Sequence, residues 1–98
     1  MPEINLDTRV TQAPDILTAD VEEELVMLSL ATDVYVALDA MAKRIWEALQ
    51  GPITAAELCQ SLLAEFEVLP ETCQQDVLRL LNQLHEHQLI QIAPTPVG

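Results

Sequence analysis

Residues 34–49, VYVALDAMAKRIWEAL, change their apolar period at a single position. Val34, Val36 and Leu38 alternate with their neighbours, as in a strand that buries one face. After Asp39 the apolar residues follow helical spacing instead, at Ala42, Ile45, Trp46 and Leu49. Asp39 suits a helix N-cap because its carboxylate can accept from the free N–H groups of the first turn. The sequence therefore predicts a strand that runs directly into a helix.

Two further strands are predicted before this one, at residues 15–21 and 25–30. In the second of them one alternating set is Val26, Leu28 and Leu30, and the other is Leu25, Met27 and Ser29. We place the first set on the core side, together with Val34, Val36 and Leu38. The outer face then carries Leu25, Met27 and Tyr35, and is apolar enough that we expect the N-terminal segment or a second chain to cover it.

Two more helices follow the first. Gly51 and Pro52 end the first helix, and Thr54 with Glu57 forms a capping box at the start of the second. Pro70 suits the first position of the third helix. The apolar stripes of these two helices are Cys59, Leu62, Leu63 and Phe66, then Cys73, Val77, Leu80 and Leu84.

The predicted fold class is therefore α+β: a three-stranded antiparallel sheet followed by three helices, in a winged helix-turn-helix-like arrangement. Residues 1–14 are expected to form a flexible N-terminal arm, residues 15–92 the domain, and residues 93–98 a C-terminal tail. Residues 89–92 are a candidate short terminal strand within that domain.

The charge of the chain restricts its partners. Its 98 residues suit one domain and carry 16 acidic against 4 basic side chains, a formal charge of −12. Such a field repels nucleic acid and anionic membranes and favours basic peptides or protein surfaces, although acidity also serves solubility alone. No apolar run approaches the about 18–20 residues that span a bilayer, and the first residues are too polar for a signal peptide. We expect a cytoplasmic protein that binds neither nucleic acid nor membrane.

No catalytic or metal-binding pattern is present. His85 and His87 lie two positions apart on a helix and so point in different directions. Cys59 and Cys73 match no metal or redox spacing and are expected to be buried thiols. The chain also lacks a glycine-rich phosphate loop. We therefore expect no enzyme activity, no catalytic residue, no metal and no cofactor.

Two binding modes remain to be weighed. A helix-turn-helix suggests DNA, but the third helix opens with Glu71, Gln74, Gln75 and Asp76, and its single cation is Arg79. Such a helix would be repelled by phosphates. An extended peptide could instead add as a strand along an open sheet edge at residues 34–38.

Three stretches of the sequence resemble the PqqD-like family, the recognition elements that bind leader peptides of ribosomally made natural products. They are LVMLSLATDVYVALDAMAKRIWEAL, ITAAELCQSLLAEFEV and CQQDVLRLLNQLHEHQLI, within about residues 15–92. The residues that match the family pattern in order are Tyr35, Leu38, Ile45, Trp46, Thr54, Asp76, Val77, Leu78, Leu81 and Leu84. Two positions depart from it: Asp39 replaces a common Asn, and Gln88 a common Gly.

The resemblance implies a module that clamps a leader peptide between the third strand and the third helix. The implied peptide-binding residues are Val34, Tyr35, Val36, Ala37, Leu38, Asp76, Val77, Arg79, Leu80 and Gln83. For Val77 and Leu80 a place in the core alone is an equal alternative. The implied function is presentation of a precursor's leader to separate modifying enzymes. The chain's length and its RIW helix are most similar to stand-alone members of the lasso-peptide type, which deliver the leader to a protease and a cyclase. Two alternatives are a chaperone for the precursor peptide in pyrroloquinoline quinone biosynthesis, and a winged-helix regulator or dimerisation module. A homodimer with exchanged arms also remains open.

Overall fold

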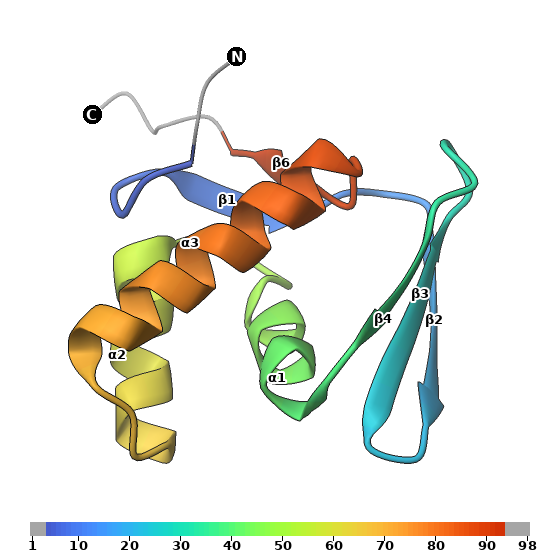
Figure 1. The fold of residues 1–98 in the computed structure, drawn as a ribbon. Helices are drawn as coiled ribbons and strands as arrows, with labels where there is room; N and C mark the ends of the chain where they lie inside the picture. Colours follow the sequence, from blue (N-terminus) through green and yellow to red (C-terminus); the bar gives the residue numbers. More distant parts are fainter. Residues whose placement is uncertain (1–3, 94–98) are drawn as a thin grey trace.

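In the computed structural model, which describes residues 4–93, two antiparallel sheets and three helices pack around one core (Figure 1). The first sheet has the order β2-β3-β4, formed by Ile16–Val21, Glu24–Ser29 and Tyr35–Leu38. The second has the order β5-β1-β6, formed by Ile53–Thr54, Arg9–Gln12 and Ile90–Ile92. The helices are α1 (Ala40–Ala48), α2 (Ala55–Glu65) and α3 (Pro70–Glu86). The predicted three strands, three helices and short terminal strand are confirmed.

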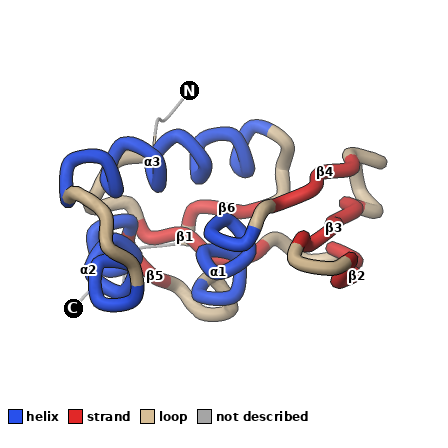
Figure 2. Tube along the Cα trace, turned by 60° about the horizontal axis from the view of Figure 1, so that its bottom comes forward, coloured by secondary structure: helices blue, strands red, loops and turns tan. Residues whose placement is uncertain are grey.

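The N-terminal segment is not a free arm, so that expectation is wrong for residues 4–14. Strand β1 is the central strand of the second sheet, and its Val10 is fully buried between Ile53 and Ile92. Ile4 is buried as well. The predicted tail lies outside the described residues except for Ala93, whose N–H donates to the carbonyl of Arg9. Figure 2 shows α3 crossing this second sheet, with the first sheet at the other end of the molecule.

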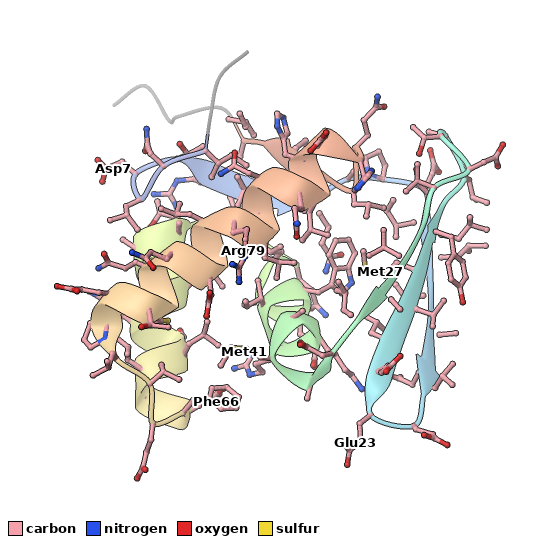
Figure 3. All side chains as sticks on the ribbon, viewed as in Figure 1. Asp7, Glu23, Met27, Met41, Phe66 and Arg79 are labelled. Atoms are coloured by element: carbon pink, nitrogen blue, oxygen red, sulfur yellow. The ribbon has the colours of Figure 1, made fainter. Side chains whose placement is uncertain are left out.

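The assignment of faces in β3 was also wrong. Leu25, Met27 and Ser29 are the buried residues, and Leu30, expected on the core side, is exposed in the turn beyond β3. Met27 pairs with Val36 and therefore shares the inner face of the sheet, towards α1 (Figure 3). Because both alternating sets of this strand are apolar, its hydrophobic pattern does not distinguish the two faces.

The helices begin where their caps predict. The carboxylate of Asp39 accepts from the N–H of Ala42 at 2.9 Å, so α1 begins directly after β4. Thr54 and Glu57 form the complete capping box of α2. This box holds the pKa of Glu57 below its usual value, because the backbone N–H and the hydroxyl of Thr54 both donate to its carboxylate. Pro70 is the first residue of α3.

Salt bridges join these elements at the surface. Arg44 of α1 donates two hydrogen bonds from Nε and one from Nη2 to Glu65 of α2, the last at 2.8 Å. Lys43 of α1 pairs with Asp20 of β2, which fixes the first sheet against that helix. Arg9 of β1 lies 3.6 Å from Glu57.

Candidate functional site

A groove runs between β4, α1 and α3. It consists of two adjoining depressions that share four lining residues, Asp39, Ala42, Leu80 and Gln83. The part next to the strand is also lined by Val36, Ala37, Leu38, Leu84 and His87. The part between the helices is also lined by Met41, Ile45, Asp76 and Arg79. In Figure 3, Arg79 on α3 and Met41 on α1 lie on opposite sides of this second part.

The edge of β4 beside the groove is open. Strand β4 is the last of its sheet, and no described strand pairs with its outer edge. The N–H of Ser29 donates to the carbonyl of Val34 at 2.9 Å, which makes this a hydrogen-bonded pair. Because such pairs alternate along an antiparallel ladder, Val36 and Leu38 also bond to β3. Tyr35 and Ala37 therefore turn their backbone N–H and C=O groups towards the open edge.

The groove has an apolar floor and a charged rim. Ile45 and Leu84 are almost completely buried, and Leu80 packs against the core. On the rim, Arg79 Nη2 donates to Asp76 Oδ1 at 2.8 Å, and the Arg79 side chain is 71% exposed. An exposed pair of this kind adds little stability, so both groups are available to a ligand. The arrangement can hold an extended chain by its backbone and receive alternate side chains on the floor.

The thiols lie away from this groove, in the core between α2 and α3. Burial raises the pKa of the Cys59 thiol from its ordinary value near 9 to about 11, and the neighbouring Cys73 contributes to the rise. Cys59 is therefore protonated at neutral pH and a poor nucleophile. No group of three His, Cys, Asp or Glu side chains suited to a metal ion occurs among residues 4–93. Within the same range no helix is long and apolar enough to cross a bilayer.

The structure brings most of the predicted site residues together. The residues of the predicted set that line the groove are Val36, Ala37, Leu38, Asp76, Arg79, Leu80 and Gln83. Val34 and Tyr35 do not line it: Val34 bonds to β3, and the Tyr35 side chain is 67% exposed on the opposite face of the sheet. Val77 is 1% exposed and belongs to the core, which is the alternative left open for it, and not to the helix wall. Whether the lining residues bind peptide stays a prediction.

The contribution of α1 was missed. Met41, Ala42 and Ile45 form one side of the groove, although they were predicted only as part of a core stripe or not at all. The signal was present, because Asp39 caps the helix immediately after the strand. The first turn of α1 must therefore lie next to the end of β4.

Comparison with known families decides the identity. Residues 24–90 match the family model described as coenzyme PQQ synthesis protein D (PqqD). The chain belongs to the PqqD family. The match begins at β3 and ends at β6, so the PqqD-family region contains all three sides of the groove. No match to the chain was found among curated proteins.

Solved structures share the same fold. The structure described as TbiB1 in complex with the TbiA(beta) leader peptide is 27% identical, with a TM-score of 0.76, and the match covers 87% of this chain and 99% of that one. The structure described as lasso peptide synthetase B1 complexed with the leader peptide is 24% identical, with a TM-score of 0.72 over 84% and 96% of the two chains.

A third structure comes from a PqqD-family protein itself. It is the solution NMR structure of the PqqD truncation of Methylobacterium extorquens PqqCD, described as a stand-alone RiPP recognition element. It is 17% identical, with a TM-score of 0.75 over 90% of this chain and 94% of that one. At this identity the likeness concerns the PqqD fold alone.

Proposed function

We propose that this chain is a non-catalytic adaptor that captures the leader of a ribosomally synthesised precursor peptide and presents it to processing enzymes. The observation that carries the proposal is the open edge of β4 beside an apolar groove floor. The leader would add as a fourth strand, exchanging hydrogen bonds with the backbones of Tyr35 and Ala37. Its alternate side chains would lie against Leu80 and the floor of the groove.

The comparisons favour the lasso-peptide pathway for this adaptor. Two of the similar structures are described as complexes with leader peptides, and one of these is at 27% identity. By this proposal the partners are a leader protease and a cyclase in the cytoplasm, where ribosomes release the precursor. Binding the leader raises the local concentration of the core peptide at the enzyme, which accelerates processing without a catalytic residue.

A second candidate is a chaperone for the precursor peptide of pyrroloquinoline quinone biosynthesis. The family description and the Methylobacterium structure support it. The groove and the strand addition would be the same, and only the precursor and the enzymes would differ. A DNA-binding regulator finds less support, because α3 opens with Glu71 and Asp76 and its single lysine or arginine is Arg79, so the helix would be repelled by phosphates.

The test is a titration of isotope-labelled protein with a synthetic leader peptide from the precursor encoded beside the chain. Saturable amide shifts at residues 35–39 and 76–87, with slowed hydrogen exchange at Tyr35 and Ala37, are expected. A scrambled leader and a DNA duplex serve as controls and should cause no saturable shift. Shifts equal for the scrambled peptide, or confined to the second sheet, would rule out leader capture in this groove.

A further inference from the structure

The outer face of the β2-β3-β4 sheet, opposite α1, is apolar and uncovered. We define it by the outward residues Leu17, Ala19, Val21, Val26, Leu28, Tyr35 and Ala37, whose register places them on one side. Leu17, Val21 and Tyr35 are 55%, 53% and 67% exposed. Figures 1 and 3 show this side of the sheet turned away from all three helices, and no described element packs on it.

In β2 the polar residues face the helices and the apolar residues of the other set face outward, the reverse of the usual arrangement in a strand that buries one face. The helix-side positions of β2 are Ile16, which packs against the core, and the polar Thr18 and Asp20, of which Asp20 pairs with Lys43 of α1. Its outward positions are Leu17, Ala19 and Val21, and all three are apolar and exposed. A sheet face that meets only water is normally the polar one. The inverted pattern indicates that this face is covered when the protein works.

The acidic residues at the two ends of the outer face indicate the charge of the partner that covers it. Glu22, Glu23 and Glu24 lie at the β2–β3 turn, and Asp15 and Asp33 lie at the opposite end of the sheet. The chain has four lysine and arginine side chains, and each pairs with an acid outside this group. The face therefore presents an apolar centre between two uncompensated acidic ends. A second copy would bring these ends against each other and be repelled.

We propose that this outer face docks a processing enzyme through a surface with an apolar centre bordered by lysine and arginine. The inference rests on the proposed adaptor function but concerns a surface separate from the groove. Tyr35 and Ala37 turn their side chains to the outer face and their backbone groups to the groove edge. The enzyme and the leader can therefore bind opposite aspects of β4 without overlap.

The test measures two affinities by calorimetry: for the synthetic leader, and for the purified protease encoded beside the precursor. The double variant Leu17→Ser/Val21→Ser removes apolar contact from positions that are more than half exposed, so the fold is retained. Its control is Leu69→Ser, a 72% exposed residue before α3. We expect the double variant to weaken enzyme binding roughly tenfold or more and the control to leave it unchanged. Leader affinity should be unchanged in both.

A second variant tests the charge. Glu22→Lys/Glu23→Lys should weaken enzyme binding at about 50 mM salt and lose most of this difference at about 500 mM. If the enzyme does not bind, or if neither double variant changes its affinity, the docking face is ruled out. The adaptor function would still stand in that case, provided that the leader binds. A wild-type dimer that Leu17→Ser/Val21→Ser converts to monomer would assign the face to a second copy instead. Absent leader binding would overturn the adaptor function itself.

Discussion

The side-chain amide of Asn82 holds the backbone of Ile4 from both sides. The N–H of Ile4 donates to Asn82 Oδ1 at 3.0 Å, and Asn82 Nδ2 donates to the carbonyl of Ile4 at 3.3 Å. The same Nδ2 donates to the carbonyl of Leu78, 2.8 Å away within α3. One partly buried amide thus joins two residues that are 78 positions apart in the sequence. It holds the segment that precedes β1 against α3, the helix that forms one wall of the groove.

Replacing Asn82 by Ala should lower the free energy of unfolding by about 1–3 kcal/mol, because it leaves partly buried backbone groups of Ile4 without partners. Denaturant unfolding measures this, with Gln75→Ala on the exposed side of α3 as the control for helix propensity. Equal midpoints for the two variants would show that residues 4–8 are not held through Asn82.

Replacing Gln88 by Gly should stabilise the protein. Gln88 follows the end of α3 with φ 61°, a left-handed conformation that strains any residue with a Cβ. We expect a gain of roughly 0.5–1 kcal/mol, reduced by the larger entropy of glycine in the unfolded chain. Gln91→Gly, in the extended backbone of β6, is the control and should destabilise. A loss of stability in Gln88→Gly would contradict the strain.

The Cys59 thiol should make stability fall in alkali. Its pKa is about 11 in the folded protein, chiefly because of burial, against an ordinary value near 9. Between these values the unfolded chain binds fewer protons than the folded one, so the free energy of unfolding decreases as pH rises. Denaturant midpoints under reducing conditions from pH about 8 to about 11 measure this. In Cys59→Ala the free energy of unfolding should decline less steeply with pH. Parallel curves for the variant and the wild type would contradict the role of Cys59.

Leu80 should be the most sensitive apolar position of the groove, because it has the larger of the two apolar side chains, Leu80 and Ala42, that line both of its parts. A carboxylate there would lose hydration when a peptide covers it, so Leu80→Glu should weaken leader binding roughly tenfold or more. Leu69→Glu adds the same charge at an exposed site that lines neither part and should bind as wild type. Fluorescence anisotropy of a labelled leader separates the two. Equal affinities would exclude the groove floor as a contact.

Local signals in the sequence were sufficient for the elements around the groove. The caps Asp39 and Thr54 and the leading Pro70 act within one helical turn, so the starts of all three helices could be read from neighbouring residues. The residues of α3 that line the groove could be predicted from the helical spacing to within one position. The sequence left Val77 between the wall and the core, because neighbouring positions on an apolar helix stripe differ by only a fraction of a turn, and the structure places it in the core.

The second sheet could not be predicted in the same way. In β1 only Val10 is fully buried, and β5 has two residues, the second of which is also the cap of α2. Their pairing depends on segments distant in sequence, and short strands without a hairpin turn carry no local signal of their partners. The inner face of β3 could be identified only from its pairing with β4, in which Met27 lies opposite Val36. That face becomes distinct from the outer one only when the helices cover one side of the sheet.

The central position of β1 has a consequence for the synthesis of the chain. This strand leaves the ribosome before the other described strands, yet one neighbour is β5 and the other is β6, which includes Ile92. Closing so long a loop requires most of the chain to be present and orders that contact late in folding. The hairpins of β2, β3 and β4 need only local closure and can form while translation continues. A nascent chain would therefore expose the open edge of β4 before α3 is anchored beside it. The groove would be able to bind a peptide only after Ile92 has been added.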